Sequence, residues 1–202
     1  MRILTGGKLV VATHNQGKLE EISKLLEPYD IDVVSARQLG LPEPVETEST
    51  FLGNARIKAH AAASAANLPA LADDSGICVD GLAGAPGVYT ADWAETGNGR
   101  DFVAAMTRTW AELEQVSASY PRRAQFCCTL VLAWPDGHDE VFEGIMPGEI
   151  VWPMRGELGH GYDPIFQPDG FSQTFAEMDR WQKNEISHRA LAFQKLVDGC
   201  FK

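Results

Sequence analysis

The chain has 202 residues, of which 45% are hydrophobic and 22% charged, as in globular proteins with a sizeable core. Lys and Arg number 17 against 28 Asp and Glu, so the formal net charge is −11 and long nucleic acid is not an expected partner. The longest apolar run, residues 126–134, is too short for a membrane span, which takes about 20 residues. The N-terminal segment lacks the apolar stretch of a signal peptide, and no CxxC pair occurs, so we expect a cytoplasmic protein, without a membrane partner, whose cysteines are reduced.

The first third of the chain predicts an α/β unit. Residues 8–13 have the apolar run of a buried strand, residues 18–26 have apolar side chains at helical spacing, and residues 32–35 predict a second strand. Residues 41–49, rich in Pro and Glu, predict a loop. The Ala-rich segment 50–67 predicts a helix with Thr50 as its N-cap.

The remaining elements alternate in the same way. An apolar segment with a polar centre at 71–79 is followed by a loop of small residues at 81–87 and a predicted helix at 100–116. Strands are predicted at 124–134, 140–145 and 148–151. A Gly- and Pro-rich stretch at 155–170 and a closing helix at 184–201 complete the chain. Without repeats or a clear linker, residues 1–202 are expected to form one α/β domain with a mixed, curved sheet and a groove lined by polar loops.

Four polar islands interrupt the apolar pattern. The first, residues 13–18 (THNQGK), joins a strand to a helix N-terminus, where free N–H groups, a hydroxyl and an ammonium suit an anion; a simple capped helix start is the alternative. The second holds Asp73 and Asp74 within an apolar segment, where carboxylates are costly to bury without a cation or hydrogen bonds. Since neighbouring side chains of a strand face opposite ways, one carboxylate can serve a cleft while the other braces the structure.

The third island, residues 46–48, is acidic. It is either a solvated loop or, through Glu46 together with Asp74, an oxygen-ligand site for Mg²⁺. The fourth combines residues 159–164 (GHGYDP) with residues 183–189 (KNEISHR). Their donors and one acceptor suit a pocket that recognises a nucleobase, although Ser187 also has the character of an N-cap.

In this order, the islands resemble the inosine triphosphate pyrophosphatase family, enzymes that remove deaminated purine nucleotides. The resemblance runs from residue 9 to about residue 196, and its most specific segments are ADDSG, GAPGVY and ISHRA. It implies an elongated α/β fold with a curved mixed sheet, two lobes flanking a central substrate groove, and a homodimer. It also implies Mg²⁺-dependent hydrolysis of ITP, dITP and XTP to the monophosphate and pyrophosphate, which keeps these nucleotides out of DNA and RNA.

The resemblance also implies roles for individual residues. Asp74 is the catalytic carboxylate, and Glu46 and Asp74 hold the metal. Substrate-binding roles fall on two groups: Thr13, His14, Asn15, Gln16, Gly17 and Lys18 with Ser75 at the triphosphate, and His160, Gly161, Tyr162, Asp163, Lys183, His188 and Arg189 around the base. Donors there would accept the 6-oxo group of hypoxanthine or xanthine and oppose the amino group of adenine.

Two positions depart from the family pattern. Gly53 stands where the family usually has Glu, which leaves Glu46 or Glu48 to serve the metal, and His160 stands where it usually has a Phe that stacks on the base. Two alternatives remain: a non-catalytic nucleotide sensor on the same fold, and an enzyme for modified pyrimidine nucleotides. The presence of Asp74, Lys18 and Glu46 favours the enzyme over the sensor.

Overall fold

The computed structural model describes residues 1–201. Over these residues it has five α-helices and one six-stranded sheet in the order β2-β1-β3-β6-β7-β8, beside a two-stranded β4-β5 ribbon. The elements of the main sheet are β1 (Gly7–Val11), β2 (Ile31–Ser35), β3 (Ala70–Val79), β6 (Arg123–Ala133), β7 (Asp139–Ile150) and β8 (Phe166–Pro168). The ribbon and helices are β4 (Glu95–Thr96), β5 (Gly99–Arg100), α1 (Gln16–Leu26), α2 (Phe51–Ala66), α3 (Phe102–Gln115), α4 (Arg180–Ile186) and α5 (His188–Cys200). No described helix combines the length and the hydropathy needed to span a membrane.

The sheet is mixed, as predicted. Strand β1 pairs in parallel with both β2 and β3, and the connections run through α1 and α2, whereas β7 and β8 are antiparallel. The α/β class and the mixed sheet are thus confirmed. The elongated shape, the groove and the single domain over residues 1–202 remain predictions.

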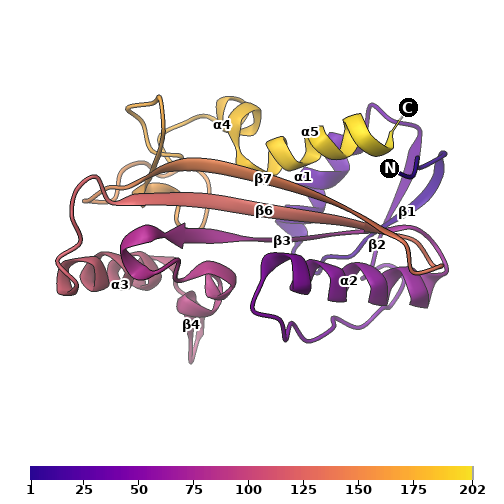
Figure 1. Ribbon diagram of the computed structural model, residues 1–202, viewed down its shortest axis with the longest axis horizontal. Coiled ribbons are helices and arrows are strands. Elements are labelled where there is room, and N and C mark those ends of the chain that lie inside the picture. The colour runs from indigo at the N-terminus through magenta and orange to yellow at the C-terminus, as the bar shows by residue number, and fades with distance from the viewer. Residues whose placement is uncertain (202) are drawn as a thin grey trace. The chain divides into compact units, whose positions relative to one another are not determined.

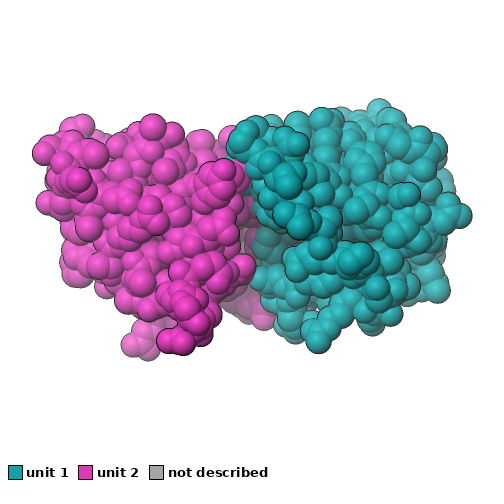
Figure 2. Space-filling model, turned by 90° about the horizontal axis from the view of Figure 1, so that it is seen from below, with its two compact units in different colours: residues 1–74, 128–143, 191–202 teal, residues 75–127, 144–190 magenta. Residues whose placement is uncertain are grey.

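Two compact units make up the chain (Figure 2). Unit 1 consists of residues 1–74, residues 128–143 and the C-terminal stretch from Leu191. Unit 2 consists of residues 75–127 and 144–190. The division falls between Asp74 and Ser75 on β3.

Unit 1 has helices on both faces of its strands (Figure 1). On β1, Leu9 and Val11 pack with α1 and α5, while Val10 packs with the alanines of α2. The same alternation continues on β3, where Leu71 lies on the α1 side and Ala72 on the α2 side. The small side chains of α2 let this helix lie close to the sheet. In unit 2, a separate core joins β3, β6 and β8 to α3.

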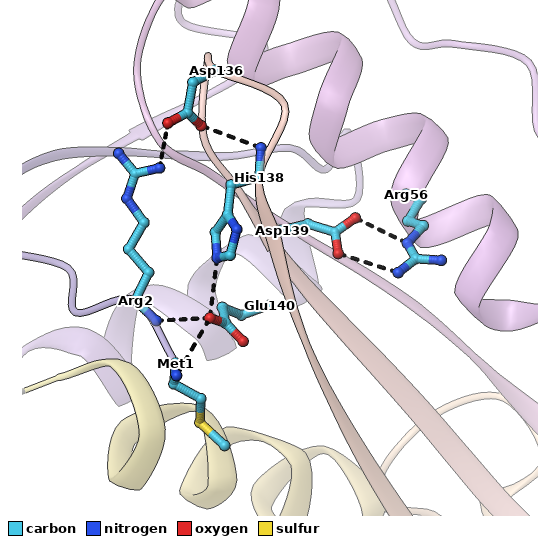
Figure 3. A network of polar contacts seen from close by, with 7 residues as sticks. All are labelled: Met1, Arg2, Arg56, Asp136, His138, Asp139 and Glu140. Atoms are coloured by element: carbon cyan, nitrogen blue, oxygen red, sulfur yellow. Dashed lines mark hydrogen bonds and ion pairs between the residues drawn. The ribbon is translucent and has the colours of Figure 1, made fainter.

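An ionic network ties α2 to the start of β7 in unit 1 (Figure 3). Arg56 donates to the Asp139 carboxylate through Nε at 2.9 Å and Nη2 at 3.2 Å, and the His60 ring lies 2.9 Å from the same carboxylate. Burial alone would raise the pKa of Asp139, but the hydrogen bonds from Arg56 and His60 outweigh burial and lower the pKa. These contacts are made by the face of α2 that carries Arg56 and His60. Lys58 lies about half a helical turn from each of them and therefore points from the opposite face of α2.

Two predicted element boundaries are wrong. Residues 140–145 and 148–151 are not separate strands, because β7 runs unbroken from Asp139 to Ile150. Burial alternates through the exposed Pro147, and its carbonyl accepts from Asp169 N at 3.0 Å, so the extended strand continues through the proline. The closing helix predicted over 184–201 is divided into α4 and α5 at Ser187, whose backbone is extended (φ −65°, ψ 153°).

Candidate active site

Strand β3 presents two adjacent carboxylates to opposite faces, each toward a lysine from the helix on that face. Asp73 follows the alternation to the α1 side, where its Oδ2 lies 2.7 Å from Lys18 Nζ. Asp74 faces the α2 side, where its Oδ1 lies 3.5 Å from Lys58 Nζ. Both carboxylates are buried. The prediction that the neighbouring aspartates face opposite ways is confirmed, whereas the role of one of them in a cleft remains a prediction.

Lys58 joins two acidic groups that are far apart in sequence. Its ammonium lies 2.6 Å from Glu46 Oε1 as well as beside Asp74. Burial disfavours the charge, yet Asp73, Asp74 and Glu46 together raise the pKa of Lys58 above its usual value. Sequence reasoning missed this residue, although one signal was available: Lys58 is a cation on an Ala-rich helix that otherwise packs on the sheet.

The unit 1 cluster carries more negative than positive charge. Three carboxylates, Asp73, Asp74 and Glu46, face two ammonium groups, Lys18 and Lys58. Burial raises the pKa of Asp74 to about 6; Lys58 and Lys18 lower it, and Glu46 and Asp73 raise it further. An additional cation would relieve this repulsion.

The donor set suits Mg²⁺, which takes oxygen ligands and usually binds one or two carboxylates together with substrate phosphates. Glu46 and Asp74 already converge on one positive centre, the Lys58 ammonium. Within residues 1–201, no group of three or more His, Cys, Asp or Glu side chains is placed to hold a metal by itself.

The segment at residues 13–18 forms the turn into α1. Thr13 Oγ1 accepts from Asn15 N at 3.2 Å, and Asn15 Oδ1 accepts from Lys18 N at 3.1 Å, which makes Asn15 the N-cap. Gln16 donates to Glu20, and a Cβ on Gly17 would lie 3.3 Å from Asn15 Oδ1. The capped-helix interpretation is thus correct, and it leaves the helix N-terminus beside the Lys18 ammonium, a favourable place for an anion.

His14 belongs to the same turn. With Lys58 it lines a mostly apolar pocket of about 100 Å³ in unit 1, whose walls come from Ala36, residues 41–44 and alanines of α2. This places His14 near the acidic cluster.

In unit 2, Asp163 organises the loop at residues 159–164. Its carboxylate is buried, accepts from His160 N at 2.9 Å and also accepts from Lys183 Nζ. A Cβ on Gly159 would lie 2.1 Å from Asp163 Oδ2, and Gly159 has a positive φ of 74°, so only glycine fits there. Asp163 and Lys183, separated by 20 residues, are thus brought together as predicted.

Tyr162 has a structural role in this loop. Its side chain is buried, its hydroxyl donates to Thr90 O at 3.1 Å and its ring meets Phe102 edge-on. Burial raises the pKa of the Tyr162 hydroxyl strongly. The hydroxyl is therefore engaged inside unit 2, and a contact between Tyr162 and a base remains a prediction. Gly161, with a positive φ, and the exposed His160 precede it.

The break at Ser187 presents His188 and Arg189 at the start of α5. Ser187 Oγ accepts from Ala190 N at 3.2 Å, which confirms the predicted capping role. The His188 ring stacks on Phe126, with centroids 4.9 Å apart and planes 13° apart. Arg189 Nη2 donates to Ser75 Oγ at 3.4 Å. A continuous helix would not allow the hydroxyl of Ser187 to cap the next turn.

The predicted site residues therefore fall into two groups. The first, in unit 1, contains residues 13–18, Glu46 and Asp74, joined by Lys58 and Asp73. The second, in unit 2, contains Ser75, residues 160–163, Lys183, His188 and Arg189. The aromatic rings of Phe126 and Phe175 lie among the second group, with Lys183 Nζ 5.3 Å from the Phe175 ring.

The Gly53 departure has a steric cause. Gly53 is the third residue of α2, and its N–H donates to the N-cap Thr50 at 3.0 Å. A Cβ at this position would lie 2.5 Å from Glu48 Cβ and 2.6 Å from Glu48 Cγ. Glu48 thus occupies the space in which a glutamate at 53 would complete a capping box with Thr50.

We expect Gly53→Glu to lower the free energy of unfolding by about 1–3 kcal/mol, because the new side chain overpacks against Glu48. Adding Glu48→Gly should recover most of this loss, since the space is then free. Urea denaturation of the four proteins of this cycle measures the coupling. If the effects of the two substitutions on the free energy of unfolding are additive, Glu48 is not the reason that position 53 requires glycine.

Comparisons with known proteins agree on one family. The model of the Ham1 family matches residues 9–199. The dITP/XTP pyrophosphatase of Ruegeria pomeroyi is 68% identical over 200 residues, covering 99% of this chain and 98% of the relative. That of Rhodospirillum centenum is 54% identical over 200 residues, with the same coverage of both chains.

Solved structures show the same likeness. A HAM1 protein from Coxiella burnetii superposes with a TM-score of 0.89 at 36% identity, covering 95% of this chain and 96% of that one. A nucleoside-triphosphatase, named dITP/XTP pyrophosphatase, from Mycobacterium abscessus gives 0.79 at 37% identity, covering 94% and 98%.

Proposed function

The chain belongs to the Ham1 family, and from this premise we propose that it hydrolyses the deaminated purine nucleoside triphosphates ITP, dITP and XTP to the monophosphate and pyrophosphate. The observation that carries the proposal is the buried Asp74 with a pKa raised to about 6, facing Lys58 and Glu46. Relatives at 68% and 54% identity that are named dITP/XTP pyrophosphatase support the substrate class.

Asp74 is the proposed base. In the metal-free protein its pKa of about 6 leaves the carboxylate ionised at neutral pH, the form that can orient a water molecule and accept its proton. Glu46 and Asp74 would hold Mg²⁺, which, when bound, supplies positive charge to the phosphate oxygens. Lys18, the α1 N-terminus and Lys58 would stabilise the negative charge of the triphosphate and of the departing pyrophosphate.

Residues 13–18 and Ser75 are proposed to bind the triphosphate, and the loop at 160–163 with Lys183, His188 and Arg189 the base. Donors on His188 and Arg189 suit the 6-oxo group of hypoxanthine and xanthine. The amino group of adenine would leave those buried donors unsatisfied, which is an effective means of rejection. We further propose that residues 1–202 act as one domain, in the cytoplasm, as a homodimer.

Pyrophosphate release tests the proposal. The purified protein is incubated with dITP and Mg²⁺, and pyrophosphate, orthophosphate and dIMP are quantified separately. We expect one pyrophosphate per dIMP and no orthophosphate. Tight dITP binding without turnover would instead support the nucleotide sensor, and release of orthophosphate would place the cleavage at another bond.

A further inference from the structure

Two cysteines of unit 2 lie together on neighbouring strands. Cys78 is on β3 and Cys127 on β6, and these strands are adjacent in the sheet. Their neighbours Ile77, Val79 and Phe126 point into the unit 2 core, so the strand alternation places both thiols on the other face. The Cys127 thiol donates a hydrogen bond to the Cys78 sulfur.

The reactivity of the four thiols is graded. Cys78 is half-buried, whereas Cys127, Cys128 and Cys200 are buried. The hydrogen bond from Cys127 lowers the pKa of Cys78, against the opposing effects of burial and Asp80. Burial raises the pKa of Cys200 to about 11. Since the thiolate is the reactive form, Cys78 is the first thiol that a soluble oxidant should reach.

We propose that Cys78 and Cys127 are a modification site at which a reversible disulfide forms, with a small-molecule disulfide such as oxidised glutathione as the oxidant. The Cys78 thiolate attacks one sulfur of the oxidant, whose S–S bond breaks and releases one thiolate, which takes up a proton. Cys127 then loses its proton and attacks the Cys78 sulfur, forming the protein disulfide and releasing the second thiol. Two protein thiols are oxidised and one small disulfide is reduced to two thiols.

The pair is next to two residues that contact side chains proposed to bind the base. Ser75, which accepts from Arg189, precedes Cys78 by three residues, and Phe126, which stacks on His188, adjoins Cys127. A covalent bond in place of the thiol hydrogen bond changes how β3 and β6 hold Ser75 and Phe126. We expect weaker substrate binding in the oxidised protein, a consequence that rests on the proposed function.

Mass spectrometry tests the disulfide independently of any activity. The full-length protein is treated with oxidised glutathione, and we expect the intact mass to fall by about 2 Da, with a Cys78–Cys127 peptide on digestion and full reversal by dithiothreitol. Cys78→Ser and Cys127→Ala should abolish this product. Cys128→Ser is the matched control, because Cys128 is adjacent to Cys127 but faces the α1 side, and it should behave as wild type. An unchanged mass, a stable glutathione adduct on Cys78, or another cysteine pairing would overturn the proposal.

Kinetics of the same samples test the consequence. We expect the oxidised wild-type protein to show a KM for dITP raised by about threefold or more, with reduced and Cys78→Ser proteins unaffected by the oxidant. A disulfide that forms without changing KM would refute the link to the base-binding group. If no preparation hydrolyses dITP, the proposed function fails while the mass result still stands.

Discussion

Asp74→Asn is expected to lower kcat for dITP by about 10²- to 10⁴-fold, the range for loss of a general base, while stabilising the folded protein. In the folded state the pKa of Asp74 is about 6, above its value of 3.8 in an exposed carboxyl, so the folded state binds the proton more tightly than the unfolded state. The ionised form of Asp74 therefore destabilises the fold increasingly as pH rises from about 4 to about 6, and fully above that. Removing the charge should raise the free energy of unfolding at pH 8 by about 1–3 kcal/mol.

Asp73→Asn is the matched control, since it is the same chemical change one residue away. Asp73 is buried against Lys18 at 2.7 Å, and breaking a buried ion pair destabilises. We expect Asp73→Asn to lower the free energy of unfolding by about 1–3 kcal/mol, the opposite sign to Asp74→Asn. The loss stays within this range because the partly exposed Lys18 can regain water. Urea denaturation of both variants in a metal-free buffer, at pH 8 and at pH 4, makes the comparison. If Asp74→Asn is destabilising at pH 8, or equally stabilising at pH 4, the charge argument is wrong.

His188→Phe is expected to remove most of the discrimination between dITP and dATP. Phenylalanine can retain the stack on Phe126 but has no ring N–H to donate to a 6-oxo group. We expect kcat/KM for dITP to fall by about 10²-fold or more, because the proposed hydrogen bond from His188 to the substrate is lost inside a buried site. The value for dATP, which we expect to be low, should change little.

The control is His138→Phe, an equal substitution at an exposed histidine on the turn between β6 and β7. This variant should keep the wild-type ratio of kcat/KM for dITP to that for dATP. If His188→Phe lowers kcat/KM equally for dITP and dATP, His188 supports the fold or contacts the triphosphate and does not recognise the base.

Much of the fold follows from local pattern. The apolar runs of β1, β3 and β6, the Thr50 cap of α2 and the strand–helix order could all be predicted, because each depends on residues close in sequence. The break at Ser187 could not, because one serine in a helical pattern is compatible with both a continuous helix and a cap. The unbroken β7 was missed because Pro147 and Gly148 resemble a turn until the alternation of burial is known.

The sequence predicts that Glu46, Asp74 and Lys18 belong to one site, which stays a prediction, but it does not predict the contacts that hold these side chains in place. Lys58 joins Glu46 to Asp74, and Lys18 is paired with Asp73. Both ion pairs depend on which helix covers each face of β3. This arrangement belongs to the tertiary structure and cannot be predicted from local sequence. The lack of space for a side chain at position 53 likewise arises because the loop that carries Glu48 folds back on the start of α2. The spacing of residues in the sequence does not determine this contact.

A competition assay tests the central claim, selection of a 6-oxo purine triphosphate, most directly. The protein is given dITP and dATP at equal concentration in one reaction with Mg²⁺, and the two monophosphates are separated and quantified over time. We expect dIMP to form faster than dAMP by about 10³-fold or more. Equal rates of formation of dIMP and dAMP would contradict the account.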